Sequence, residues 1–227
     1  MATALVEPGW IVLPRFLGAD AATALRGEID ARHQDGGLRR ARTGRNGREA
    51  VRRSVRGDLI AWLDPDGLAD TSALAAWHGR MQLLGAALGD ALRLPVAGFD
   101  GHMTIHPPGS RYQVHVDAPT GASRRLLSAI CYLNPRWSAA DGGCLRLFTR
   151  PGAPPTEGAA FVDVEPHEGT LVLFRSADFW HEVRPTTGER LSLTGWFLSR
   201  SRSPGPAHVA RPRGPGSGGR SLRRGGA

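Results

Sequence analysis

The chain has 227 residues, of which 41% are hydrophobic and 22% charged, so it is long enough to bury one sizeable globular core. No apolar run approaches the roughly 18 residues of a membrane-spanning helix, and we therefore expect no membrane insertion. The formal charge is +8 at pH 7, but six arginines and no acid lie in residues 201–227, which leaves +2 for residues 1–200. This distribution argues against a fold whose main task is binding nucleic acid.

Two further features concern the cellular compartment. Cys131 and Cys144 are too few for a disulfide scaffold, and both lie in apolar runs, so we expect reduced thiols in the core. The N-terminal stretch lacks a basic leader and is expected to form the first folded strand, not a secretion signal. Together these features favour the cytoplasm.

The first part of the chain contains the predicted helices. We expect a strand and turn at 5–18, then a helix at 19–33 with Asp20 as a candidate cap. A Gly- and Arg-rich segment, 36–56, predicts a mobile loop that leads into a strand within 53–64. The helix predicted at 68–92 carries one apolar stripe that should pack on a sheet: Leu74, Trp77, Met81, Leu84 and Leu88.

From Phe99 onward the pattern changes to short β-like runs separated by turns. Eight are expected, at 101–106, 112–117, 126–133, 144–149, 160–165, 170–175, 181–185 and 190–198. They predict a mostly β fold with flanking helices (α+β) built on a jelly-roll, or double-stranded β-helix, core. We therefore divide the chain into N-terminal elements (1–98), a β core (99–199) and an Arg/Gly/Pro-rich tail (200–227) that is expected to be disordered.

The motif His115-Val116-Asp117 is the first candidate for chemistry. On a strand, residues i and i+2 point to the same face, so the imidazole and the carboxylate can both project inward. His181 opens a later strand that a jelly roll could place alongside. Two histidines and one carboxylate on one face of a metal leave positions open for reactants, which is typical of non-heme iron(II) oxygenases. Taken alone, H-x-D also occurs often by chance, as part of an ordinary polar surface.

The strand that begins at Arg190 strengthens the metal interpretation. Arg190, Ser192, Thr194 and Trp196 share one face of it. A buried arginine requires an anion, and its planar fork fits a carboxylate. A dicarboxylate could bind the metal at one end and Arg190 at the other.

Two zinc alternatives are disfavoured. Pro185 stands where H-E-x-x-H would need its second histidine, and a structural zinc site would need more Cys or His at short spacing. The remaining histidines show no ligand spacing, and we interpret them as ordinary surface or core residues, with His106 a partial exception.

Six segments in order resemble the 2-oxoglutarate oxygenases, and more narrowly the protein prolyl 4-hydroxylases of the hypoxia-sensing type and their bacterial relatives. They are VRGDLIAWL (55–63), YQVHVD (112–117), CYLNPRW (131–137), DGGCLRLF (141–148), HEVRP (181–185) and RLSLTGWF (190–197). Together with the stretch 101–198, they match about 110 positions.

The resemblance implies a role for each matching position. Iron(II) would be bound by His115, Asp117 and His181, and the distal carboxylate of 2-oxoglutarate by Arg190 and Tyr132, with Thr194 and Tyr112 nearby. The substrate entrance would be lined by Asp58, Arg125 (with Arg124 an equal candidate) and Trp196. Animal members usually carry a tyrosine on the strand before the H-x-D segment, where this chain has His106.

We therefore expect an iron(II)- and 2-oxoglutarate-dependent dioxygenase that uses O₂, with ascorbate a further candidate cofactor, and that hydroxylates a prolyl residue of a protein or peptide to give succinate and CO₂. One alternative is hydroxylation of a free amino acid or other small molecule. Another is an inactive binding module whose Arg-rich tail contacts a polyanion, although the tail has no aromatic residues for base stacking. The oligomeric state stays open.

Overall fold

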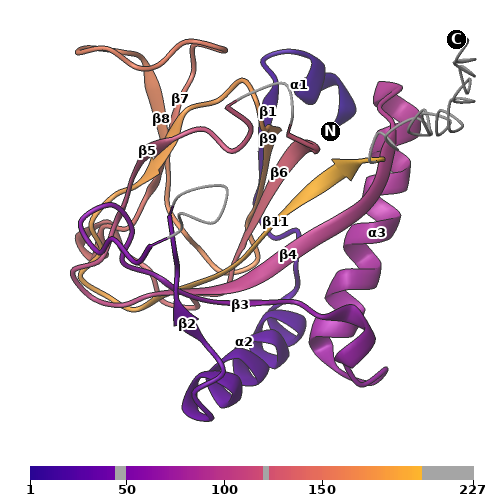
Figure 1. The fold of residues 1–227 in the computed structure, drawn as a ribbon, viewed down its shortest axis with the longest axis vertical. Helices are drawn as coiled ribbons and strands as arrows, with labels where there is room; N and C mark the ends of the chain where they lie inside the picture. Colours follow the sequence, from indigo (N-terminus) through magenta and orange to yellow (C-terminus); the bar gives the residue numbers. More distant parts are fainter. Residues whose placement is uncertain (44–49, 120–122, 201–227) are drawn as a thin grey trace, which may run out of the picture.

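Two antiparallel sheets face each other in the computed structural model, which describes residues 1–43, 50–119 and 123–200 (Figure 1). In spatial order, the larger sheet contains β1 (Trp10–Leu13), β9 (Leu171–Arg175), β6 (Arg125–Tyr132), β11 (Arg190–Ser199), β4 (Val96–His106), β3 (Leu59–Trp62) and β2 (Arg39–Arg40). The smaller sheet contains β5 (Tyr112–His115), β10 (His181–Val183), β7 (Leu145–Phe148) and β8 (Phe161–Val164). This arrangement is a double-stranded β-helix, as predicted.

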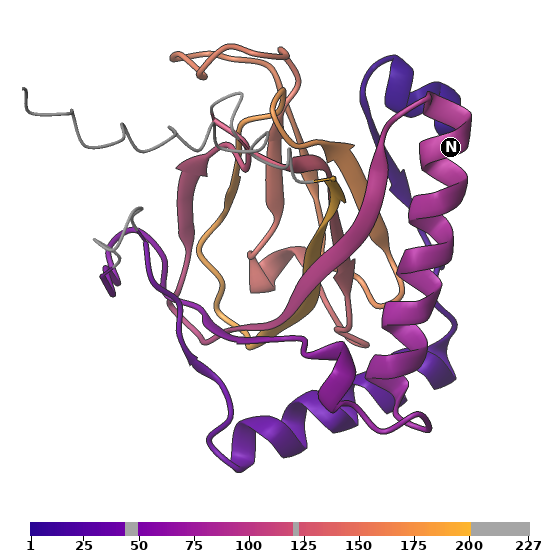
Figure 2. The same cartoon turned by 45° about the vertical axis from the view of Figure 1, so that its right-hand side comes forward.

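The helices cover the outer face of the larger sheet. Figure 2 shows α3 (Ala73–Leu92) lying along β4, with α2 (Ala19–Gln34) crossing near its lower end. A short α1 (Ala2–Val6) precedes β1, and two 3₁₀ turns lie at Pro65–Gly67 and Ala139–Asp141 in the loops. The helices and this face of the sheet share the larger hydrophobic core.

Strand periodicity divides the polar from the apolar face of the larger sheet. On β6, Leu127, Ala129 and Cys131 enter the core beneath the helices. Ser128, Ile130 and Tyr132 alternate with them and face the space between the two sheets. Polar side chains with a chemical role can therefore gather between the sheets without disturbing the core beneath the helices.

The N-terminus of α3 is stabilised by its own N-cap residue and by a residue of α2. The Ser72 hydroxyl accepts a hydrogen bond from the Ala75 amide at 2.9 Å. The carboxylate of Glu28, on α2, accepts from the amides of Ala73 and Leu74. A negative charge at a helix N-terminus also interacts favourably with the helix dipole, so Glu28 joins the two helices.

All eight predicted core strands are present, and β4 begins earlier than predicted, at Val96. The helix predicted at 19–33 is confirmed, but its N-cap is Gly18, with Asp20 in the first turn. The second helix begins at Ala73 instead of 68, because Ser72 and Glu28 cap it there. Its predicted stripe faces the core.

The N-terminal prediction was wrong in part. Residues 2–6 are helical, and the strand is limited to 10–13, where it pairs with β9. The predicted loop 36–56 contains the short β2, and its residues 44–49 lie outside the described residues. The predicted disordered tail also lies outside them from residue 201 onward, and the division into three parts stays a prediction.

Among the described residues, both cysteines are free, Cys131 buried and Cys144 half-buried. None of the helices in the described part of the chain is long and apolar enough to cross a membrane.

Candidate metal centre and cosubstrate site

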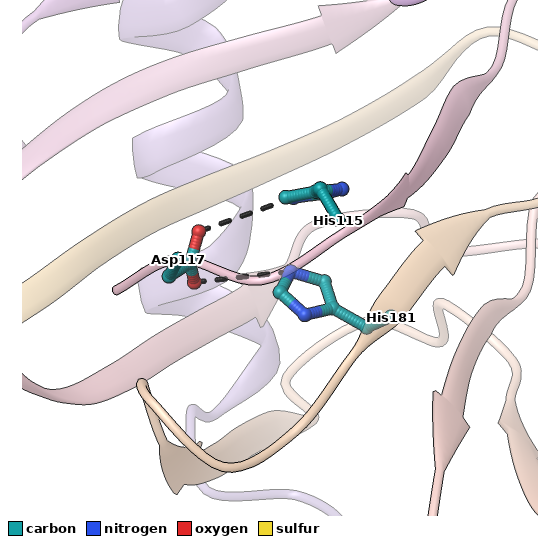
Figure 3. A group of neighbouring side chains, drawn as sticks. All are labelled: His115, Asp117 and His181. Carbon is teal, nitrogen blue, oxygen red and sulfur yellow. Dashed lines mark ion pairs between the residues drawn. The ribbon is translucent and has the colours of Figure 1, made fainter. Parts of the chain in front are cut away.

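Three predicted metal ligands meet between the sheets (Figure 3). His115 ends β5 and lies directly across from His181, the first residue of β10. Asp117 follows two residues after His115, and its two carboxylate oxygens lie 3.9 Å from His115 Nε2 and 3.8 Å from His181 Nε2. One ligand atom from each residue lies within 4.8 Å of the others, so the group is compact enough to surround one metal ion.

The backbone orients both imidazoles toward this point. His115 Nδ1 contacts the Gln113 carbonyl oxygen at 2.8 Å, and His181 Nδ1 contacts the Phe179 carbonyl oxygen at 3.0 Å. A carbonyl can only accept, so each Nδ1 carries a proton, and Nε2 is the nitrogen left to face the metal position. Such second contacts are what fix metal-binding histidines in one tautomer.

The charge states also suit a cation. Burial, followed by the neighbouring His181, lowers the pKa of His115 to about 3, so its ring is neutral at pH 7. Burial alone would raise the pKa of Asp117, but His181, His115 and the Ser128 hydroxyl, which donates to Oδ2 at 2.6 Å, outweigh it and lower that pKa to about 2. The site thus offers one carboxylate and neutral imidazole to a divalent metal.

Arg190 lies in the same cavity, buried to 1% exposure. Its Nε donates to the Gly143 carbonyl at 2.8 Å, which fixes the guanidinium, while its Nη2 has no partner. Gly143 has a φ of +63°, and an added Cβ would lie 3.0 Å from the Trp137 ring, so glycine suits this turn. No carboxylate among the described residues forms an ion pair with Arg190. A buried cation without a counter-ion is costly, and an anionic ligand would remove that cost.

Two neighbours of Arg190 also have buried polar atoms without hydrogen-bond partners. The Tyr132 hydroxyl is buried without a partner, and burial raises its pKa to about 12, so it keeps its proton and can donate. Arg190 lies across from His106 in the β11–β4 register, and both ring nitrogens of His106 are buried without partners. These orphaned polar atoms fit a carboxylate ligand such as the distal end of 2-oxoglutarate.

One cavity of about 790 Å³ connects the triad with Arg190. Its lining includes the predicted residues Thr194, Trp196, Tyr112, Asp58 and Arg125. Tyr112 stacks on the His115 ring, with centroids 3.7 Å apart, so it lies beside the metal site.

The structure separates the two arginines that the sequence left as equal candidates. Arg125 lies 3.5 Å over the Trp196 ring and donates to the Asp117 carbonyl at 3.3 Å. Arg124 instead donates to the Ser199 carbonyl and does not line the cavity. Asp58 is 1% exposed and forms an ion pair with Arg56.

The lining also contains residues that were not predicted, among them Trp62, His102 and Thr104. His102, which we interpreted as ordinary, is buried, and its Nδ1 lies 2.8 Å from the Thr104 hydroxyl. Its ring meets Trp62 edge-on at 5.1 Å and lies 5.6 Å from Trp196. The alternation of His102, Thr104 and His106 was the available signal, because the three share one face of a strand.

Comparison with known proteins identifies the class of enzyme to which this fold and site belong. Residues 101–198 match the model of the 2OG-Fe(II) oxygenase superfamily. A prolyl hydroxylase of Mus musculus, EGLN3, is 31% identical over 210 residues that cover 86% of this chain and 80% of the relative. The chain therefore belongs to the 2OG-Fe(II) oxygenase superfamily and is a 2-oxoglutarate-dependent dioxygenase that uses iron.

Solved structures narrow the resemblance within that family. A prolyl-4-hydroxylase of Pseudomonas putida is 37% identical, with a TM-score of 0.75 and coverage of 88% of this chain and 97% of that one. A prolyl hydroxylase of Trichoplax adhaerens, solved with a peptide of the hypoxia-inducible factor oxygen degradation domain, is 26% identical with the same TM-score and covers 87% of each chain.

Proposed function

We propose that this enzyme hydroxylates a prolyl residue in a protein or peptide, with 2-oxoglutarate and O₂ as cosubstrates and succinate and CO₂ as co-products. The observation that carries the proposal is the His115–Asp117–His181 group in one cavity with Arg190, a buried cation without an anion. The resemblance to three prolyl hydroxylases supports proline as the target.

In this proposal, the metal would be held by the Nε2 atoms of His115 and His181 and by the carboxylate of Asp117. When bound, iron(II) supplies the redox chemistry by which one atom of O₂ enters the new hydroxyl group and the other enters succinate. The Ser128 hydroxyl orients Asp117 and contributes to its lowered pKa, and the two backbone carbonyls hold the imidazoles in place. The protein thus contributes a preformed site that needs little rearrangement.

Arg190 and Tyr132 would bind the distal carboxylate of 2-oxoglutarate. The guanidinium offers a charged donor at Nη2, and the tyrosine hydroxyl offers a neutral one. Both atoms gain a hydrogen bond only when the ligand is present, which favours binding of a dicarboxylate over a monocarboxylate. Thr194, two residues after Ser192 on β11, lines the same cavity.

The substrate would enter past Trp196, Tyr112 and Arg125. Tyr112 stacks on the His115 ring, and the Arg125 guanidinium lies over the Trp196 ring; aromatic faces beside the triad suit a pyrrolidine ring. Gly37, Thr43 and the arginines between them, all from the predicted loop, also line the cavity. This supports the proposal that the loop contacts the substrate.

The test is to supply iron(II), 2-oxoglutarate and a proline-containing peptide, and to measure succinate together with a 16 Da gain in peptide mass. His181→Ala should abolish both signals, because the metal loses one of its three ligands. Full turnover by His181→Ala would refute the assignment of the metal site. Free proline, used in parallel, separates peptide hydroxylation from the small-molecule alternative, for which we see no supporting contact.

We also infer that the enzyme works in a reducing cytoplasm and that ascorbate can serve as its reductant. The free Cys131 and Cys144 support the first inference, and the family resemblance supports the second. Measuring turnover number with and without ascorbate tests the latter: a number that ascorbate does not change would contradict it. The inactive alternative is disfavoured because the triad and Arg190 are all in place.

A further inference from the structure

The outer end of the active-site cavity is strongly basic. Among the described residues, the cavity is lined by seven arginines and by two acids, Asp58 and Asp117. Both acids are engaged already, Asp58 by Arg56 and Asp117 by the two histidines and Ser128. Neither acid therefore neutralises Arg32, Arg39 or Arg40.

Three of these arginines form what we call the arginine rim: Arg32, at the end of α2, and Arg39 and Arg40, which make up β2. Figure 1 shows β2 at one end of the larger sheet, next to α2. Arg39 Nη1 donates to the Leu38 carbonyl and Arg40 Nη1 to the Gly57 carbonyl at 3.3 Å. Among the described residues, no carboxylate forms an ion pair with any member of the rim.

Resting on the proposed peptide hydroxylation, we propose that the arginine rim binds acidic residues that flank the target proline. The cavity of about 790 Å³ lies within the size range of small-molecule sites, and 2-oxoglutarate together with a prolyl ring would occupy the part around the triad and Arg190. The neighbouring residues of a peptide would then extend toward solvent, and Arg32 and Arg39 are among the exposed residues of the lining. Guanidinium groups that already give one N–H to a carbonyl keep other donors for a carboxylate.

Charge complementarity favours an acidic peptide over a neutral or basic one. The cavity that the rim borders would hold the metal and, beside aromatic side chains, the prolyl ring. This arrangement fits a peptide in which one apolar residue lies between acidic ones. A nucleic acid would present phosphates to the same arginines, and its competition is therefore one of the outcomes to be measured. The rim should act mainly on the encounter and on KM, because partly exposed charges influence association more than chemistry.

The experiment uses two peptides that are identical except that Asp and Glu around the proline in one are Asn and Gln in the other. For the wild-type protein we expect kcat/KM to be about tenfold higher with the acidic peptide at low salt, and the advantage to shrink at high salt. In Arg39→Gln/Arg40→Gln the ratio should fall toward 1. Arg150→Gln, which removes an exposed arginine outside the cavity, should keep the wild-type ratio.

The outcomes separate this inference from the proposed function. Equal hydroxylation of both peptides by the wild-type protein would overturn the rim proposal and leave prolyl hydroxylation standing. No hydroxylation of either peptide, with 2-oxoglutarate still consumed in the absence of peptide, would contradict the proposed function itself. If a single-stranded oligonucleotide inhibits more strongly than the free acidic peptide segment, and this inhibition requires Arg39 and Arg40, the rim is a nucleic-acid contact and the proposal is wrong.

Discussion

At the scale of single residues, the site contains buried polar groups that lack hydrogen-bond partners in the absence of a ligand. Arg190, Tyr132 and His106 each bury polar atoms that have no partner. Most buried polar atoms in folded proteins are satisfied, so three such residues around one point are informative. They indicate that part of the stability of the loaded protein comes from the cosubstrate.

Arg190→Lys should weaken 2-oxoglutarate binding. Lysine keeps the positive charge but loses the planar fork and the Nε bond to Gly143 that holds it in place. We expect KM for 2-oxoglutarate to rise about ten- to a hundredfold. Succinate release at varied 2-oxoglutarate measures this, with Arg150→Lys as the control; an unchanged KM would show that Arg190 does not contact the cosubstrate.

His106→Phe separates a binding role from a packing role. Burial, followed by the charge of Arg190, lowers the pKa of His106 to about 3, so the wild-type ring is neutral and its removal deletes no charge at pH 7. If His106 bonds the cosubstrate, KM for 2-oxoglutarate should rise about three- to tenfold. The ligand-free protein should not lose stability in urea, because phenylalanine leaves no unpaired nitrogen. A loss of stability with an unchanged KM would assign His106 to packing alone.

At the scale of elements, the contact between α2 and α3 stabilises the layer of helices on the outer face of the larger sheet. Glu28 accepts from two amides at the start of α3, where four amides would otherwise lack partners. Glu28→Ala should therefore lower the free energy of unfolding by about 1 kcal/mol. Urea denaturation measures it, and the exposed Glu157→Ala provides the control. Equal effects of the two substitutions would show that the cap contributes nothing.

Local patterns predicted most of the elements. Alternation identified all eight core strands, and the spacing of Leu74, Trp77 and Met81 identified α3. His115 and Asp117 could be paired because they are two residues apart in a β-like run; they do meet at one site, although the strand ends at His115 and Asp117 lies just beyond it. The helix at residues 2–6 was missed because five residues are too few for a helical period to show.

Long-range register was the part that local patterns could not supply. His102 and Thr104 belong to the site because β4 pairs with β11, which places them opposite Thr194 and Ser192. Such pairings connect residues about ninety positions apart, and no short-range rule specifies them. In the same way, only the structure showed that Arg125, and not Arg124, enters the cavity.

At the scale of the whole molecule, the two histidine ligands come from β5 and β10 of the smaller sheet, with Asp117 just after β5, and the cosubstrate residues come from the larger sheet. Manganese(II) with 2-oxoglutarate would therefore connect the two sheets and should stabilise the native protein. At a hundred times the dissociation constant we expect the melting temperature to rise by roughly 5–10 °C. Thermal denaturation measures this shift, and His181→Ala should lose most of it. An equal shift in that variant would place the metal elsewhere.

Strand β11 carries Arg190 at one end and Trp196 six residues later, and it is hydrogen-bonded to β4 on one side and β6 on the other. About 20 Å of extended chain between these positions is thereby fixed in length. Arg190 therefore cannot move along the sheet without breaking its pairing with β4. The triad lies on the other sheet, where His115 pairs with His181. The span that a dicarboxylate has to bridge is thus set by how the two sheets are held against each other, and we expect selection of the cosubstrate by its length to depend on the packing between the sheets.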